Sequence, residues 1–299
     1  MPLIAEGHRV GVIARGQARL DEIAALHGDL VAVASADVGD AGALEAAVDT
    51  VLAGAKPRIW VNCAMATSFS PFEQMEVDEF DRIVRTTFLG QVNGLRLALR
   101  HMERGNIVNV GSCLGYRPVP GQSAYCAAKH AINGFTGAVR SELLRDKRPI
   151  ALSLVQLPAI NTPQFTWARN RLARMPQPAP PIFAPGVAAR AVMKAMRSDA
   201  REILVGGSVL KLVFGDMLLP DYIDRKLADQ GFEMQKSGTP EPGGRPDNLF
   251  APVERPSGAA GDFSDKARDR GFIVDSDLAR KAVLGGIVPG AFLIGLILG

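Results

Sequence analysis

A tyrosine and a lysine four residues apart carry the clearest chemical signal in this sequence. Tyr125 and Lys129 stand at the start of a predicted helix, so their side chains project from one face of it. A phenol with a pKa of about 10 is a poor acid or base at neutral pH. A neighbouring ammonium favours the phenolate and lowers that pKa. We therefore expect Lys129 to make Tyr125 a usable proton donor or acceptor.

A serine hydroxyl is predicted to lie beside this pair. Ser112 follows the predicted strand Asn106–Gly111, thirteen residues before Tyr125. Side chains at the carboxyl ends of strands in an open parallel sheet face the crevice where ligands bind. Ser112 could thus hold a substrate oxygen next to the phenol. Taken alone, the Tyr/Lys spacing also fits a buried aromatic beside a solvated lysine.

The elements that must position these residues alternate along the chain from Arg9 to about Val205. Short apolar runs separate longer segments with apolar residues at helical spacing, which is typical of a parallel sheet covered on both faces. The fold class predicted is α/β, a doubly wound parallel sheet. The expected strands are Arg9–Ala14, Leu30–Ala34, Arg58–Asn62, Asn106–Gly111, Ile150–Gln156 and Glu202–Val205, and the expected helices are Arg19–Leu26, Ala41–Leu52, Asp78–Met102, Tyr125–Leu144 and Pro185–Arg197.

This arrangement resembles the short-chain dehydrogenase/reductase family over roughly Glu6 to Gly206. The resemblance rests on the strand ending in Gly111-Ser112, on Ser123-Ala124 before Tyr125, and on the small-residue helix that follows. It implies a Rossmann-like fold and an oxidoreductase that transfers a hydride between a nicotinamide cofactor and a carbonyl or secondary alcohol. Ser112, Tyr125 and Lys129 would be its catalytic residues, and small molecules its substrates.

The resemblance also implies where a dinucleotide would bind. Arg15 ends the first strand, where a basic residue accommodates a 2′-phosphate, so NADP(H) is preferred over NAD(H). A surface arginine is the competing reading, and Asp37 could simply cap a turn while Asn62 satisfies backbone groups. The residues matching the family's cofactor contacts are Arg15, Asp37, Val38, Asn62, Ala64, Tyr125, Lys129, Pro158, Ile160 and Thr162.

Two departures from the family pattern bear on function. Thr87 stands where the family's proton relay has an asparagine, with Asn93 one turn later as a possible substitute. No Gly-x-x-x-Gly-x-Gly turn follows a strand and opens a helix, although that turn supplies backbone N–H groups to a cofactor pyrophosphate. About 25 residues of family pattern, including a central strand, are expected to be missing, and the neighbouring strands should then lack backbone partners.

A truncated coding start or a degraded relative would each explain this departure. The rival functional hypothesis is a catalytically impaired or non-catalytic, membrane-tethered remnant or scaffold that lacks the cofactor phosphate loop. We expect a Rossmann-like domain over 1–235, a Pro/Gly-rich linker over 236–271 and an apolar tail over 272–299. Within the tail, Ala282–Gly299 is uncharged and follows Arg280-Lys281, so membrane contact is possible there. The segment Gln164–Phe183 is expected either to cover an apolar substrate pocket or only to pack.

Composition excludes several other functions. The 299 residues carry a formal charge of +3 without a basic block, which disfavours nucleic-acid binding. Three dispersed cysteines indicate a reducing compartment such as the cytoplasm. The four histidines lack metal-ligand spacing, so no metal is expected, and no G-x-S-x-G elbow supports a hydrolase. By resemblance, the helices Asp78–Met102 and Tyr125–Leu144 would pair two or four copies into a homodimer or homotetramer.

Overall fold

The main sheet has five strands and lies at the centre of the fold. A computed structural model describes residues 2–253, 258–283 and 285 of the chain. The strand order is β11-β9-β6-β5-β3, parallel except for β11, which runs antiparallel to β9. This confirms the predicted α/β class. The strands are β3 (Ile59–Asn62), β5 (Gly105–Val110), β6 (Ile150–Gln156), β9 (Glu202–Val205) and β11 (Ile273–Asp275).

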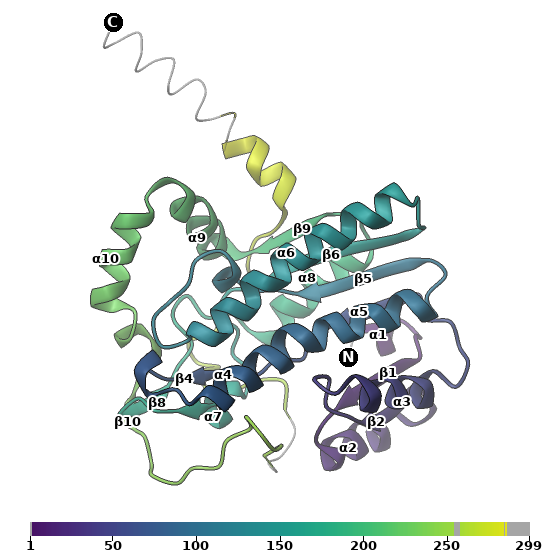
Figure 1. The fold of residues 1–299 in the computed structure, drawn as a ribbon, viewed down its shortest axis with the longest axis horizontal. Helices are drawn as coiled ribbons and strands as arrows, with labels where there is room; N and C mark the ends of the chain where they lie inside the picture. The colour runs from purple at the N-terminus through teal and green to yellow at the C-terminus, as the bar shows by residue number, and fades with distance from the viewer. Residues whose placement is uncertain (1, 254–257, 284, 286–299) are drawn as a thin grey trace, which may run out of the picture.

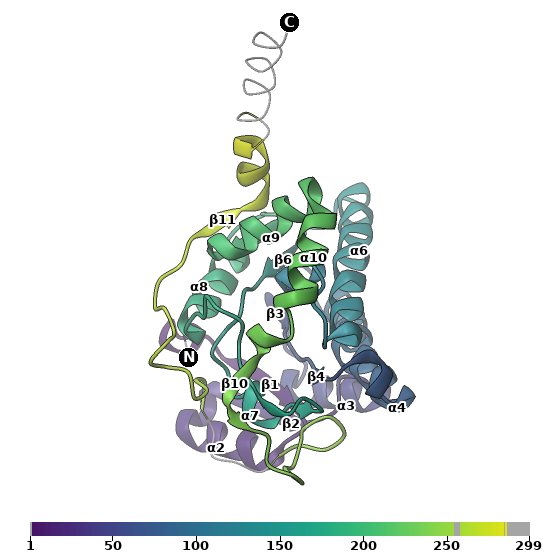
Figure 2. The ribbon, with the colours of Figure 1, turned by 90° about the vertical axis from the view of Figure 1, so that its left-hand side faces the viewer.

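Helices cover both faces of this sheet, as Figures 1 and 2 show. The helices α5 and α6 lie on one face and α8 on the other, where Val187 and Ala191 pack against Val108 and Val155 of the strands. Pro185 begins α8 at a position where its missing N–H costs nothing. The helices are α4 (Val77–Val84), α5 (Gly90–His101), α6 (Ser123–Arg145), α8 (Pro185–Met196), α9 (Gly206–Leu218) and α10 (Pro220–Gln230).

The long helix predicted over Asp78–Met102 is interrupted. A π-helical turn, Arg85–Leu89, separates α4 from α5. The Thr87 hydroxyl accepts a hydrogen bond from the Ala66 N–H and donates one to the Ala66 carbonyl, both at 2.9 Å. The buried threonine thus ties the wide turn to the loop after β3.

The first two strands form a sheet of their own. In the described part of the chain, β1 (Val10–Ala14) pairs only with β2 (Val31–Ser35), in parallel, and β3 pairs only with β5. The helices α2 (Gln17–His27) and α3 (Ala41–Leu52) accompany this small sheet, and α1 (Pro2–Ala5) precedes it. The predicted break beside β1 is therefore present, and among the described residues no backbone ladder connects the two sheets.

Side-chain contacts link the small sheet to the main sheet. Leu44 and Val48 of α3 pack on Leu97 of α5, and Ile13 of β1 and Trp60 of β3 join the same apolar cluster. The Trp60 indole donates a hydrogen bond to the Asn62 side chain at 2.9 Å. The small sheet is thus held against the main one by apolar packing and by ion pairs such as Glu45 with Arg100. Apolar packing is non-directional, unlike a strand ladder.

The segment 236–271, expected to be a linker, lies against the domain in its described part. It begins with β10 (Lys236–Pro240), which pairs with β8 (Arg174–Pro176), and further on Leu249 is completely buried. Short strands β4 (Ser68–Phe69) and β7 (Arg169–Asn170) pair nearby, next to the one-turn helix α7 (Gln164–Trp167).

The predicted tail 272–299 begins inside the fold, because β11 completes the edge of the main sheet. Arg280 then donates a hydrogen bond to the buried carboxylate of Glu202 at 3.3 Å. Most of the apolar stretch Ala282–Gly299 lies outside the described residues. Within those that are described, no helix has the length and apolar character needed to span a bilayer.

A close helix–strand approach gives a stability prediction. A Cβ on Gly94 of α5 would lie 2.1 Å from Asn62 Oδ1, whereas a Cβ on Gly137 of α6 would meet nothing within 4 Å. Gly94→Ala should therefore lower the free energy of unfolding by about 1–3 kcal/mol. Gly137→Ala is the matched control and should raise it by up to about 1 kcal/mol through helix propensity. Urea unfolding of both variants checks this, and equal stabilisation by both would contradict the close packing.

Candidate active site

The three residues expected to do proton chemistry converge at the carboxyl end of the main sheet. Ser112 follows β5 and is 7% exposed, and Tyr125 and Lys129 occupy the first two turns of α6. The Ser112 hydroxyl lies close enough to the Tyr125 phenol to lower its pKa against the effect of burial. The Ser112 oxygen also accepts a hydrogen bond from the Leu114 N–H at 3.1 Å, which fixes its rotamer. The serine and the phenol are thus held side by side.

Lys129 is buried without a carboxylate partner among the described residues. Its Nζ donates a hydrogen bond to the Val110 carbonyl at 2.7 Å and lies 5.5 Å from the centre of the Tyr125 ring. Gln91 donates to the same carbonyl at 3.0 Å. Burial lowers the pKa of Lys129 to about 8, because the charged amine has lost its hydration. A cation over an aromatic face is partly compensated by the ring quadrupole.

The phenol does not show the acidity that the sequence predicts. Burial raises the pKa of Tyr125, and the Ser112 hydroxyl only partly opposes this. The expectation that this pKa is lowered is therefore wrong for the described arrangement, because desolvation sets the direction of the shift. The Tyr125 phenol therefore stays protonated at physiological pH.

Several residues matched to the family have structural partners. The Asn62 amide donates a hydrogen bond to Asn109 Oδ1 at 2.8 Å and its oxygen accepts from Trp60, so both ends are engaged in the core. Asn93 donates to the Val38 carbonyl at 2.9 Å, which places its amide away from Tyr125. Both hydrogen bonds of the Thr87 hydroxyl go to Ala66. None of these contacts forms a relay to Lys129.

The stretch Pro158–Thr162 is mostly buried under other parts of the chain. Ile160 is 8% exposed and packs with Phe183 in the main core, so its side chain faces inward. Asn161 binds the backbone of Phe263 and the side chain of Ser264. Of the segment Gln164–Phe183, Phe165 and Phe183 are core residues, which agrees with the packing alternative rather than with a cover over a pocket.

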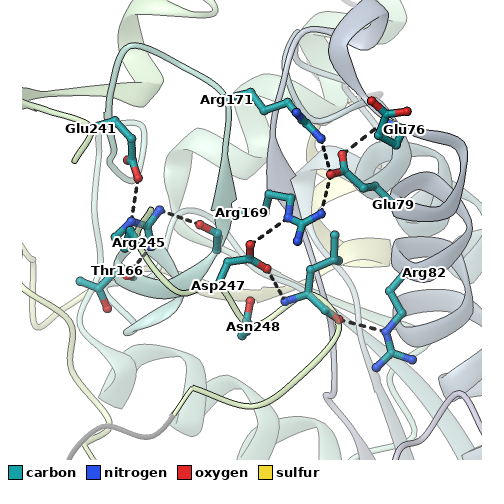
Figure 3. A network of polar contacts seen from close by, with 12 residues as sticks. Glu76, Glu79, Arg82, Thr166, Arg169, Arg171, Glu241, Arg245, Asp247 and Asn248 are labelled. Carbon is teal, nitrogen blue, oxygen red and sulfur yellow. Dashed lines mark hydrogen bonds and ion pairs between the residues drawn. The ribbon is translucent and has the colours of Figure 1, made fainter. Parts of the chain in front are cut away.

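A second polar group lies at the end of β1. Asp37 pairs with Arg82 of α4 and accepts a hydrogen bond from the Gly39 N–H at 2.9 Å. Burial works to raise the pKa of Asp37, but these two partners and Arg15 outweigh it and hold that pKa below its usual value. Arg15 also donates to the Asn248 and Leu249 carbonyls. Arg82 donates to the Leu249 carbonyl as well (Figure 3). No sequence signal singled out Arg82 or these two carbonyls.

An arginine-rich network continues from this group (Figure 3). Arg169 and Arg171 both bind the fully buried carboxylate of Glu79, and Arg169 also binds Asp247 at 2.8 Å. Burial works to raise the pKa of Glu79, but the two guanidinium groups hold it below its usual value. Two arginines of the segment Gln164–Phe183 therefore serve an internal ion-pair network.

The residues of this arrangement have the chemistry that a nicotinamide dinucleotide needs at both ends, but the arginines at one end already have partners within the chain. Ser112, Tyr125 and Lys129 supply two hydroxyls and an ammonium at the rim of the sheet, as the reacting end requires. At the other end, Leu249 is completely buried among Ala66, Ile83 and Ala124, with Tyr125 packed on the same cluster. The donors of Arg15 and Arg82 at this end are engaged by the Asn248 and Leu249 carbonyls.

Comparison with known proteins gives the family of the chain. The family description "short chain dehydrogenase" matches residues 1–172. The uncharacterized oxidoreductase YxnA of Bacillus subtilis is 27% identical over 243 residues, which are 80% of this chain and 66% of that protein. The putative oxidoreductase SadH of Mycobacterium tuberculosis is 37% identical over 131 residues, or 42% of this chain. The chain spans 66% and 47% of the lengths of these two relatives.

Solved structures agree with the fold. A short-chain dehydrogenase from Streptomyces avermitilis superimposes with a TM-score of 0.63 and 23% identity, covering 77% of this chain and 90% of that one. A closed form of serine dehydrogenase complexed with NADP+ gives a TM-score of 0.51 and 26% identity, covering 54% of this chain and 66% of that one. With the matched residues making up more than half of its length, this chain belongs to the short-chain dehydrogenase family.

Proposed function

We propose that this chain is an oxidoreductase that reduces a carbonyl to an alcohol with NADP(H), with Tyr125 as the proton donor. The observation that carries the proposal is the convergence of Ser112, Tyr125 and Lys129 at the carboxyl end of the sheet. Membership of the family and relatives named as oxidoreductases support the reaction class. The substrate is a small molecule with a carbonyl group.

The protein's part in this reaction is to place and protonate the substrate oxygen. Ser112 donates a hydrogen bond to the carbonyl oxygen and orients it toward the phenol. A reduced nicotinamide, when bound, supplies a hydride to the carbonyl carbon. As negative charge develops on the oxygen, Tyr125 transfers its phenolic proton to it, and the carbonyl becomes a C–H and an O–H bond.

The raised pKa of Tyr125 favours this direction. A phenol that stays protonated is ready to donate to a developing alkoxide, which is a far stronger base. The phenolate that remains is stabilised by the Lys129 ammonium, 5.5 Å from the ring centre, and takes up a proton from solvent after the alcohol leaves. Lys129 therefore has to be charged during turnover, although its pKa is only about 8.

The preference for NADP(H) over NAD(H) rests on Arg15. It follows β1, the position at which a basic side chain accepts a 2′-phosphate in dinucleotide-binding folds. Asp37, Val38, Asn62, Ala64, Pro158, Ile160 and Thr162 complete the proposed cofactor contacts. For Asn62 and Ile160 that contact is made through the backbone, because their side chains face the core.

The first test of this function is Tyr125→Phe, which removes only the transferable proton. We expect NADPH-dependent reduction of a panel of aryl and alkyl ketones, followed by NADPH absorbance, to fall at least about a hundredfold. Tyr222→Phe is the control, because Tyr222 is 61% exposed on α10 and should leave the rate unchanged. Reduction that survives Tyr125→Phe at the parental rate would refute the assignment.

A second test uses the pH dependence of stability that the buried ammonium imposes. Below pH 8 Lys129 is protonated in both the folded and unfolded states, and the folded state bears the cost of burying the charge. Between about pH 8 and 10.5 only the unfolded state still holds the proton, so the free energy of unfolding rises with pH. Lys129→Met removes this dependence and should stabilise the fold at pH 7 by on the order of 2 kcal/mol.

Urea unfolding at pH 7, 9 and 10.5 checks this expectation. The advantage of Lys129→Met over the parent should shrink as the pH rises. The control is Lys226→Met on the exposed side of α10, whose difference from the parent should be independent of pH. An advantage of Lys129→Met that stays constant over this range would show that the amine is not desolvated.

A further inference from the structure

Two guanidinium groups converge on one backbone oxygen at the end of β1. The Leu249 carbonyl accepts hydrogen bonds from Arg15 Nη1 at 3.2 Å and from Arg82 Nε at 2.9 Å. The preceding carbonyl, of Asn248, accepts from Arg15 Nη2 at 2.5 Å. Arginines in this converging geometry are typical of sites for phosphate or carboxylate oxygens, which accept charge-assisted hydrogen bonds about twice as strong as those to neutral acceptors.

The local charge favours an anion over these peptide carbonyls. Burial lowers the pKa of Arg15, and the next largest cause is the positive charge of Arg82, so the two guanidinium groups repel one another. Asp37 is the carboxylate that pairs with Arg82 and lies near Arg15. One negative charge therefore faces two positive charges, and a doubly charged phosphate would relieve the imbalance.

We propose that Arg15 and Arg82 together form a phosphate-monoester subsite, and that the Leu249 carbonyl holds the place of a phosphate oxygen while the subsite is closed. Resting on the proposed function, this assigns the subsite to the 2′-phosphate of NADP(H). It adds Arg82, on α4, as a specificity-determining residue beside Arg15. The segment Arg245–Pro252, called the strap below, covers the subsite and has to leave before the phosphate binds.

Several contacts hold the strap in place. Leu249 is completely buried among apolar side chains, Asp247 binds Arg169 at 2.8 Å, and the Asn248 N–H donates to the Trp167 carbonyl at 2.8 Å. The Arg245 guanidinium, only 7% exposed, donates to the carbonyls of Thr166 and Ala168. The phosphate binds only those molecules in which the strap is released. Its apparent affinity is therefore its intrinsic affinity multiplied by the fraction of released molecules. Weakening the strap should then strengthen phosphate binding.

Calorimetric binding of adenosine 2′,5′-bisphosphate, with adenosine 5′-monophosphate as the comparison, tests the subsite without any turnover. Arg82→Gln should weaken bisphosphate binding at least about tenfold and leave monophosphate binding unchanged. The control is Arg85→Gln, which also removes one positive charge. Arg85 lies three residues after Arg82 and its side chain is exposed. Arg82→Lys keeps the charge and should give an intermediate affinity, and circular dichroism verifies that each variant is folded.

The strap is tested with the same probe. Leu249→Ser should bind the bisphosphate about tenfold more tightly than the parent, while Leu144→Ser, at an exposed site on α6, should not change the affinity. Saturating bisphosphate should also accelerate chymotryptic cleavage after Leu249 in the parent chain, because Leu249 is completely buried while the strap is closed. Protection of Leu249 by the nucleotide, or equal affinity of the parent, Arg82→Gln and Leu249→Ser, would overturn the proposal.

These outcomes are separable from a failure of the proposed reaction. The bisphosphate has no nicotinamide, so its binding reports on Arg15, Arg82 and the strap alone. Suppose that ketone reduction depends on Tyr125 but that substitutions of Arg82 and Leu249 leave the affinity for the bisphosphate unchanged. This result would support the oxidoreductase and refute the subsite. No bisphosphate binding by any variant would refute the subsite and the NADP(H) preference together.

Discussion

The buried ammonium of Lys129 is the constraint around which the reacting end is built. It has lost its hydration and is held by the Val110 carbonyl and the Tyr125 ring instead of by a carboxylate. An uncompensated buried charge costs stability, and proteins retain such groups chiefly where chemistry uses them. The same burial that lowers the pKa of Lys129 raises that of Tyr125. In the proposed reaction Tyr125 donates a proton, and the Lys129 ammonium stabilises the phenolate that follows.

The two ends of the crevice are joined by side chains and not by a strand ladder. Arg15 and Asp37 belong to the small sheet, whereas Ser112 and Tyr125 belong to the main one. Between them run the apolar cluster around Trp60 and the contacts of Leu249, which touches both the arginines and the cluster that includes Tyr125. The strap therefore spans the two halves of the site, and its movement would change the surroundings of Arg15 and of Tyr125 together.

Much of the fold follows from local sequence pattern. All six expected strands are present to within about a residue, because buried parallel strands are short apolar runs that stand out between helices. The break beside β1 was also predictable, from the absence of a glycine turn and of a strand before Arg9. The strands β10 and β11 were not, because Lys236–Pro240 carries a glycine and a proline and pairs with a distant segment by tertiary contact.

The site was predictable only in part. Ser112, Tyr125 and Lys129 could be identified because their spacing is local to one strand end and one helix. The sign of the Tyr125 pKa shift was missed, since desolvation depends on what covers the ring, and Leu249 is more than a hundred residues away. Arg82 and the strap carry no sequence signal for the same reason: their partners, Asp37 and Arg15, are brought to them by the fold.

Carbon-13 NMR of the phenolic carbons of labelled tyrosine is the most direct measurement of the central claim, which is that Tyr125 is a neutral proton donor. The chain has three tyrosines, so single Phe variants assign each signal. The account predicts that the Tyr125 signal shows no ionisation up to about pH 10, the ordinary value for a phenol. A signal that titrates well below that value would instead show a phenol acidified by Lys129 and would contradict the account.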